Sequence, residues 1–311
     1  MRNRNASVVC FANCLRHVGA VFVAGLLVGC ASRPIALKPL RDHDARSLSV
    51  LFSAGKTFVQ RYSHDSHIKT FENGDLVREK DGAVDFVVRS VYSEIKPGAP
   101  HVAAQVTSLE QDGSMDLREL AFPQLNETME FIFTAQGGIL KAGSYDSNSL
   151  FFVPPISLPE SPVKVGDTWT LRHSWLSPKA GIPLTMDVVT ILKNFFKCGD
   201  SECAELEISG RVSIPGLKKQ KVKFESRLRG TMLFSLAHGQ TLWFAISSDE
   251  SFRTGTNGAD VESCLASVTI EPNILNWNLQ QKLNCKRGMQ EPLPAALYAE
   301  ASKADETKDR K

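Results

Sequence analysis

Two neighbouring segments of the chain alternate strictly between apolar and polar residues. In 203–214 the apolar side chains of Leu206, Ile208 and Val212 are separated by charged or small polar residues, and 221–229 repeats the pattern. Residues two apart along a strand lie on the same face of a sheet, so each segment is expected to bury one face and expose the other. Such one-sided burial is typical of antiparallel sheets. The pattern therefore predicts a mainly β fold.

Turn-forming pairs divide much of the remaining chain into segments of strand length. Glycine follows asparagine or aspartate in several of these pairs, a combination that favours the tight turns of hairpins. We expect antiparallel strands arranged either as two related units or as one large curved sheet, with few short helices. The pairs in which glycine follows asparagine or aspartate are Asn73–Gly74, Asp81–Gly82, Asp112–Gly113 and Asn257–Gly258.

A proline-rich joint and two similar stretches indicate how the chain is divided. Proline removes a donor from a sheet ladder, so the prolines within 153–166 are expected to interrupt strand pairing. Thr128–Phe133 and Thr231–Leu236, on either side of this joint, resemble each other, which favours a weak internal duplication. The predicted boundaries are a signal peptide over 1–29, a lipidated tether over 30–47, a first β unit over 48–152, the joint over 153–166, a second β unit over 167–288 and a disordered tail over 289–311.

The N-terminal segment has the parts of an export signal. Arg2, Arg4 and Arg16 form a basic region without acidic residues, and an apolar run from Val18 to Gly29 follows it. As a helix this run would span about 18 Å, well short of the ~30 Å hydrocarbon core of a membrane. We therefore expect a cleaved signal sequence rather than a transmembrane anchor.

The end of the apolar run, Leu27-Val28-Gly29-Cys30, resembles the lipobox of bacterial lipoproteins. The resemblance implies cleavage before Cys30, a diacylglycerol thioether on its sulfur and acylation of the new amine. Two or three acyl chains exceed the single-chain binding that remains reversible, so the anchor should be stable. An ordinary cleaved signal with a chance cysteine and an uncleaved interfacial segment are the alternatives. Ala31 stands where enteric lipoproteins carry an inner-membrane retention aspartate, which favours the outer membrane, facing the periplasm.

Four cysteines remain in the mature chain besides Cys30: Cys198, Cys203, Cys264 and Cys285. An even number in an oxidising compartment favours disulfides. We expect pairs that join neighbours in the sequence, Cys198 with Cys203 and Cys264 with Cys285. A zinc site is the alternative, because four residues separate Cys198 from Cys203, but export disfavours free thiolates.

Pro162–Thr170 contains the phrase Val-Gly-Asp-Thr-Trp. It is similar to a segment of several uncharacterised families of secreted β-rich bacterial proteins, in which a Val-Gly-Asp-x-Trp turn leads into a strand. The resemblance supports a β fold and export, and it implies no activity.

Charge and motif content argue against several classes of function. The chain has 36 basic and 34 acidic residues, and removing Arg2, Arg4 and Arg16 with the signal peptide leaves 33 against 34. A nearly neutral mature chain gives no reason to expect a nucleic-acid partner. The sequence contains neither a Gly-x-Ser-x-Gly elbow nor a phosphate-binding loop. We predict a non-enzymatic protein without catalytic residues and without a cofactor.

Two polar clusters are interpreted as strand surface rather than as sites. His64-Asp65-Ser66-His67 is the densest metal-like group. Residues i and i+3 of a strand point to opposite faces, so His64 and His67 would converge only across a turn. Glu127 and Glu130 are expected to diverge for the same reason, which leaves no acid–base pair. We therefore predict no metal site and no catalytic carboxylates.

The expected function is binding rather than catalysis. A concave apolar sheet face would carry a lipid or another hydrophobic ligand, by analogy of fold with half-barrel carriers of the periplasm. The alternative is a scaffold or accessory subunit of an envelope machine, which would bind a protein partner through the surface of the sheet. An envelope enzyme without a recognisable motif is the third alternative. An apolar cavity in the structure would favour the carrier.

The two alternating segments also predict a hairpin register. Their apolar faces stay together only if paired residues have equal parity. Pairing Pro215 with Lys221 satisfies this condition. The same register sets Arg211 opposite Glu225, a cross-strand ion pair worth ~0.2–1 kcal/mol.

Overall fold

The structure is a computed structural model. It describes residues 38–40, 44–50, 55–96, 99–112, 115–134, 136–154, 158–177, 181–198, 201–216, 222–272 and 274. The chain divides into two compact units, and all of the described residues belong to the second unit, Pro34–Lys311. No helix in this described part is long and apolar enough to cross a membrane.

The described residues form β-strands and two short 3-10 helices. The prediction of a mainly β fold with few short helices is therefore confirmed. The strands are β1 (Lys38–Pro39), β2 (Thr57–Glu72), β3 (Asp75–Lys96), β4 (Ala99–Asp112), β5 (Thr128–Phe133), β6 (Ile139–Ala142), β7 (Thr168–Leu176), β8 (Pro183–Cys198), β9 (Ser201–Ser213), β10 (Val222–Ser235), β11 (Gln240–Thr254) and β12 (Asn257–Glu271). The helices are η1 (Leu117–Leu120) and η2 (Leu150–Phe152).

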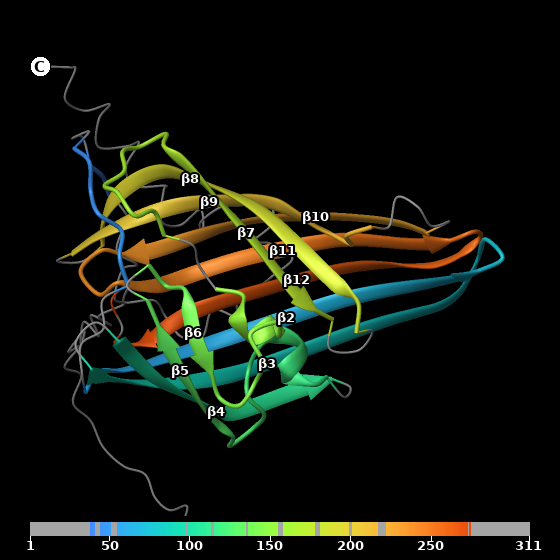
Figure 1. The fold of residues 1–311 in the computed structure, drawn as a ribbon, viewed down its shortest axis with the longest axis horizontal. Coiled ribbons are helices and arrows are strands. Elements are labelled where there is room, and N and C mark those ends of the chain that lie inside the picture. The colour runs from blue at the N-terminus through green and yellow to red at the C-terminus, as the bar shows by residue number, and fades with distance from the viewer. Residues whose placement is uncertain are drawn as a thin grey trace, which may run out of the picture. The chain divides into compact units, whose positions relative to one another are not determined.

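All of these strands belong to one antiparallel sheet. Its order is β1-β8-β9-β10-β11-β12-β2-β3-β4-β5-β6, and β7 also pairs with β8 (Figure 1). The pairing of β12 with β2 joins strands from both predicted β units, so one large curved sheet is the correct alternative of the two. In the described part of the chain the sheet is open, with β6 at one edge and β1 and β7 at the other.

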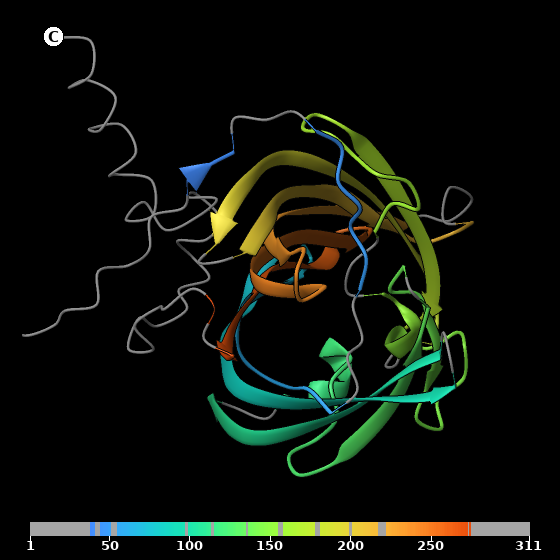
Figure 2. The same cartoon turned by 90° about the vertical axis from the view of Figure 1, so that its left-hand side faces the viewer.

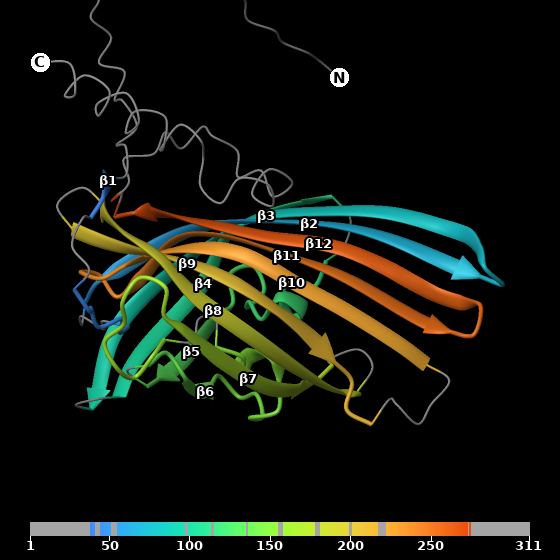
Figure 3. The ribbon, with the colours of Figure 1, turned by 90° about the horizontal axis from the view of Figure 1, so that it is seen from above.

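The sheet curves around an interior. Figure 2 shows the strands bending around the short helical segments η1, between β4 and β5, and η2, between β6 and β7. We call this inner side the concave face. Figure 3 shows the β2–β3 and β11–β12 hairpins running side by side, with their turns at the same end of the sheet. Their tips are joined by a hydrogen bond from Gly74 N to Thr256 O of 2.9 Å.

Alternation along the strands divides the buried apolar side chains between the two faces. One cluster on the concave face lies over β2–β5 and includes Phe86 and Val88, and a second lies over β8–β10 and includes Leu206 and Met232. We call these the two inner clusters. A third cluster, the outer cluster, contains Leu233, whose side chain points to the opposite face from that of Met232.

The β9–β10 hairpin forms, but its predicted register is wrong by two residues. Leu206 pairs with Met232, whereas the prediction places Gly230 at that position. As a result, Arg211 does not face Glu225. Leu206 and Met232 are fully buried, and burying such side chains stabilises a fold by about 1.5–3 kcal/mol each, more than an exposed ion pair does. The predicted faces are correct, because a shift of two residues preserves parity.

The predicted turn at Asp81–Gly82 is also wrong. Both residues lie inside the continuous strand β3, and Gly82 pairs with Ser66 of β2. The β2–β3 hairpin instead turns at Asn73–Gly74, where Asn73 has φ 52° and Gly74 has φ 92°. That turn was predicted, and it leaves the strand free to continue through Gly82.

The phrase within Pro162–Thr170 forms a turn that leads into β7. Lys164 N donates a hydrogen bond to the Asp167 carboxylate at 2.8 Å. Gly166 has φ 94°, a conformation that glycine adopts without steric cost. The strand begins directly afterwards, at Thr168.

Candidate functional site

An apolar cavity of about 400 Å³ lies on the concave face and is lined by residues of both inner clusters. Its walls come from strands that are far apart in the sequence, with Val88 and Ala104 on β3 and β4, and Leu206 and Met232 on β9 and β10. Ligand pockets typically enclose about 300–1,000 Å³ and are lined mainly by apolar side chains. The cavity therefore has the size and surface of a site for a small hydrophobic molecule.

The segment after η1 completes one wall of the cavity. The carboxylate of Asp116 caps this short helix by accepting a hydrogen bond from Arg118 N at 3.0 Å. The helix ends at Ala121, which has the left-handed φ of 61°. The reversal that follows brings Phe122 to the cavity.

Three aromatic rings hold this wall in place. Tyr62 of β2 stacks on Phe86 of β3, with ring centroids 5.0 Å apart. The ring of Phe122 meets both of them edge-on, at 4.7 Å from Tyr62 and 4.8 Å from Phe86. Each such aromatic contact adds about 0.5–1.5 kcal/mol beyond its buried area. The η1 segment is therefore packed firmly onto the sheet.

No charged side chain occurs among the described residues that line the cavity. An ion in this space would lose its hydration and would find no opposite charge among those residues. Most of the lining is apolar, and its polar side chains are uncharged amides, hydroxyls and phenols. They belong to Gln60, Tyr62, Ser90, Tyr92, Thr190, Gln240 and Thr241.

A hydrogen-bonded group at one side of the cavity is centred on Gln60. Its amide nitrogen donates to Thr241 O at 3.2 Å and to Thr269 Oγ1 at 3.3 Å. The hydroxyl of Tyr62 donates to Gln60 Oε1 at 2.9 Å. Burial raises the pKa of Tyr62 to about 12, so this phenol is a neutral hydrogen-bonding group at physiological pH.

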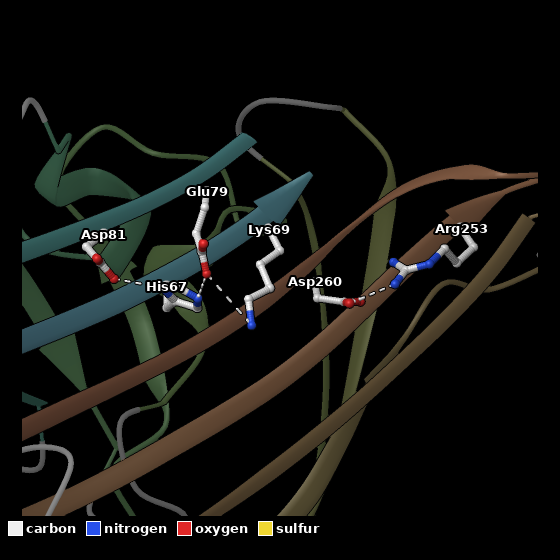
Figure 4. Close-up of polar contacts among 6 residues, drawn as sticks. All are labelled: His67, Lys69, Glu79, Asp81, Arg253 and Asp260. Atoms are coloured by element: carbon white, nitrogen blue, oxygen red, sulfur yellow. Dashed lines mark hydrogen bonds and ion pairs between the residues drawn. The ribbon is translucent and has the colours of Figure 1, made fainter. Parts of the chain in front are cut away.

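The predicted His64–His67 cluster is divided between the two faces, as the strand spacing requires. His64 is buried, and it shares a face with Tyr62, which lines the cavity. His67 lies on the opposite face between two carboxylates, with Nε2 2.9 Å from Glu79 and Nδ1 2.7 Å from Asp81 (Figure 4). The two histidines therefore form no common site.

Cross-strand ion pairs continue along the outer face of the long hairpins. Figure 4 shows Lys69 beside Glu79, 3.9 Å apart, and Arg253 beside Asp260, 2.7 Å apart. Exposed pairs of this kind contribute about 0–1 kcal/mol each. Within the described residues, no group of three or more His, Cys, Asp or Glu side chains is placed to hold a metal ion.

The two carboxylates weighed as an acid–base pair have separate partners. Glu130 lies on β5, with Oε2 3.6 Å from Nε2 of His101. Glu127 accepts hydrogen bonds from the backbone of Gln124 at 2.9 Å and from Arg118 at 3.3 Å. Neither residue lines the cavity.

The predicted cysteine pairs are observed in part. Cys198 and Cys203 form a disulfide near the turn between β8 and β9, as predicted. Cys264 is buried in the outer cluster. Its predicted partner Cys285 and the predicted lipidation site Cys30 lie outside the described residues. The second pair therefore stays a prediction.

Replacing both Cys264 and Cys285 with serine should lower the free energy of unfolding by about 3 kcal/mol, because their bridge would close a loop of about 22 residues. The matched Cys198→Ser/Cys203→Ser variant should lose about 2 kcal/mol, because its loop is shorter. Urea unfolding measures both losses, and peptide mapping without reductant identifies the pairs. Alkylation of Cys264 in the unreduced native protein would contradict the prediction.

Sequence reasoning missed the residues that make the cavity. Gln60 and Tyr62 follow the same period-two pattern as the buried Phe58, so alternation along this strand indicates their face. Phe122 lies in a connecting segment, where no period predicts its position. The cavity itself depends on which strands become neighbours, and alternation does not specify that.

Comparisons with known proteins identify no family. No protein-family model matches the chain. No curated protein matches it either.

Among solved structures, lipovitellin, in a structure of its lipid–protein interactions, matches at 10% identity and a TM-score of 0.44, over 70% of this chain and 25% of that one. The chain thus spans about a quarter of the lipovitellin chain. An outer membrane channel from Pseudomonas putida F1 matches at 10% identity and a TM-score of 0.23, over 73% of this chain and 100% of that one. A mutant porin from Rh. blastica matches at 8% identity and a TM-score of 0.25, over 68% of this chain and 100% of that one. These TM-scores are too low to assign a common function.

Proposed function

We propose that this chain is a lipid-anchored protein of the cell envelope that binds a hydrophobic ligand on the concave face of its sheet. The cavity of about 400 Å³ is the observation that carries the proposal. A cavity of this size can hold water, so without a ligand its mostly apolar lining would be exposed to that water. A bound apolar molecule would remove this lining from water, which favours binding.

The proposal also explains the composition of the lining. An apolar surface with a few neutral hydrogen-bonding groups suits hydrocarbon, whereas a catalytic site for polar substrates needs positioned acids, bases or nucleophiles. A scaffold that binds protein partners by its outer surface would not need the cavity. The anchor is proposed from the Cys30 lipobox resemblance, and it would place the protein at the membrane from which a lipid can be taken.

Filling the cavity should displace the ligand. Val188 lines the cavity, and the next residue, Val189, points to the opposite face and is 39% exposed. We expect Val188→Phe to reduce the lipid that co-purifies with the full-length protein at least about fivefold, because the added ring occupies the space of the hydrocarbon, while Val189→Phe should leave it unchanged. Lipid extraction followed by mass spectrometry measures the amount per protein.

A second variant keeps this test decisive if Val188→Phe perturbs folding. Ala104 lines the same cavity from the other inner cluster, so Ala104→Phe should also displace the ligand. Urea unfolding identifies which variants retain the native fold. Equal lipid content in a folded cavity variant, in the Val189→Phe control and in the wild type would overturn the proposal. Recovery of a lipid-free protein within a defined membrane complex would favour the scaffold instead.

A further inference from the structure

The side chains of the concave face change from apolar to hydroxyl-bearing to ionisable between the cavity and the tips of the long hairpins. Residues paired across an antiparallel sheet share a face, so the partners on β10, β11, β12, β2 and β3 form rows. Successive rows lie two residues apart along each strand, about 7 Å. The cavity row is Gly230, Ile246, Leu265, His64 and Val84; the serine row is Leu228, Ser248, Ser263, Ser66 and Gly82; the ionisable row is Ser226, Glu250, Val261, Ile68 and Lys80.

The cavity row is apolar except for His64. Ile246 and Leu265 line the cavity directly. His64 is 6% exposed, and its Nδ1 has no hydrogen-bond partner within the described residues. Burial lowers the pKa of His64, so its imidazole is neutral at physiological pH. Within the described residues, the cavity row therefore holds one neutral polar atom, Nδ1 of His64, that is buried without a hydrogen-bond partner.

The serine row contains three serines besides Leu228 and Gly82, and it carries no ionisable side chain. The hydroxyls of Ser248 and Ser263 lie 2.9 Å apart on neighbouring strands. Ser66 continues the row on β2 and donates to Gly82 O at 3.4 Å. A serine hydroxyl can donate and accept at once, and it rotates to suit a partner. The row therefore offers hydrogen bonds to ester or hydroxyl oxygens without demanding a charge.

The ionisable row follows at the next step. Glu250 and Lys80 lie on this row, on β11 and β3, and the apolar side chains of Val261 and Ile68 separate them. Among the residues of the three rows, these two are the acidic and the basic side chain. Over about 14 Å the surface therefore passes from hydrocarbon-like to hydroxylated to ionic.

We infer that the ligand is an acyl lipid bound in one orientation. Its hydrocarbon chains occupy the cavity, its uncharged linkage lies against His64 and the serine row, and its head group faces the ionisable row. The inference rests on the proposed function. The reverse orientation would bury a charged head group in a space whose described lining carries no charge, which costs several kcal/mol even after relaxation.

Photo-crosslinking of the full-length protein tests the orientation. One probe is a phosphatidylethanolamine with a diazirine at the end of an acyl chain, and the other carries the diazirine on the head group. The chain probe should label peptides that contain Phe122 or Met232, and the head-group probe should label the hairpin half of β2, β3 and β11. An excess of unlabelled lipid should abolish both signals.

The outcomes separate the two proposals. Head-group labelling at Phe122 or Met232, or the same labelling pattern from both probes, would overturn the orientation and leave ligand binding intact. Failure of both probes to label above the competed control would overturn the proposed function as well. Chain labelling confined to the hairpin half would exclude the cavity as the hydrocarbon site.

A pair of variants tests the role of the serine row. The wild type should bind a diester phosphatidylethanolamine roughly five- to tenfold more tightly than its diether analogue, as expected for about one net hydrogen bond to an ester carbonyl. Ser248→Ala/Ser263→Ala should lose this preference. Ser247→Ala, which removes a hydroxyl from the opposite face of β11, should retain it. An unchanged preference in the double variant would remove the serine row from the site.

Discussion

Replacing Phe86 with alanine should lower the free energy of unfolding by about 3–5 kcal/mol. Phe86 is 1% exposed, stacks on Tyr62 and meets Phe122 edge-on, so the change leaves a void beside two rings. It also removes the surface on which the segment after η1 is packed. Urea unfolding followed by fluorescence or circular dichroism measures the loss.

Phe252→Ala is the matched control, because it removes the same side chain from a strand of the same sheet. Phe252 is 39% exposed on a long hairpin, so much of its ring is already in water and its loss should cost clearly less. Equal losses in the two variants would contradict the prediction. They would show that the packing of the Tyr62, Phe86 and Phe122 rings does not hold the η1 segment on the sheet.

Replacing Cys30 with alanine should abolish acylation of the protein. The lipobox resemblance makes the Cys30 thiol the acceptor of the diacylglycerol, and alanine has no nucleophile to replace it. Each buried methylene of an acyl chain contributes about 0.8 kcal/mol to membrane binding, so two or three chains account for a stable anchor. Mass spectrometry of the N-terminal peptide and metabolic labelling with an alkynyl fatty acid measure the modification.

A Cys30→Ala protein that remains lipidated would refute the anchor. Cys10→Ala is the matched control, since that cysteine lies within the predicted signal peptide and should be removed with it. The control should be acylated and should partition into detergent as the wild type does.

Short-range patterns predicted the faces of the strands correctly. Leu206 and Ile208 are buried, and the intervening Glu207 is exposed, as the alternation in 203–214 requires, whereas Glu205, which was expected to be exposed, is buried. The same rule separates His64 from His67, which lie on opposite faces of the sheet. These successes share a reason: the side-chain period of a strand is two residues, so a few neighbouring residues suffice to reveal it.

Register and turn position were predicted less well. Charge pairing at Arg211 favoured a β9–β10 register that burial of Leu206 against Met232 overrides, because the burial energy is larger. The Asp81–Gly82 pair has the composition of a turn, but β3 continues through it and pairs with β2. Local composition permits a turn, and the ladder of hydrogen bonds along a whole strand decides whether one forms.

The alternation, the turn at Asn73–Gly74 and the spacing of Cys198 and Cys203 are local features, and they were enough to predict an antiparallel fold. They predicted one buried face, whereas the outer cluster buries part of the other face as well. The cavity depends on contacts between residues far apart in the chain. β12 pairs with β2, so Leu265 lies beside His64 and the two halves of the chain share one concave face. This pairing is chosen by the burial summed over the entire sheet, which no window of ten residues contains. Only the tertiary structure therefore places Val88 and Met232 around the same space.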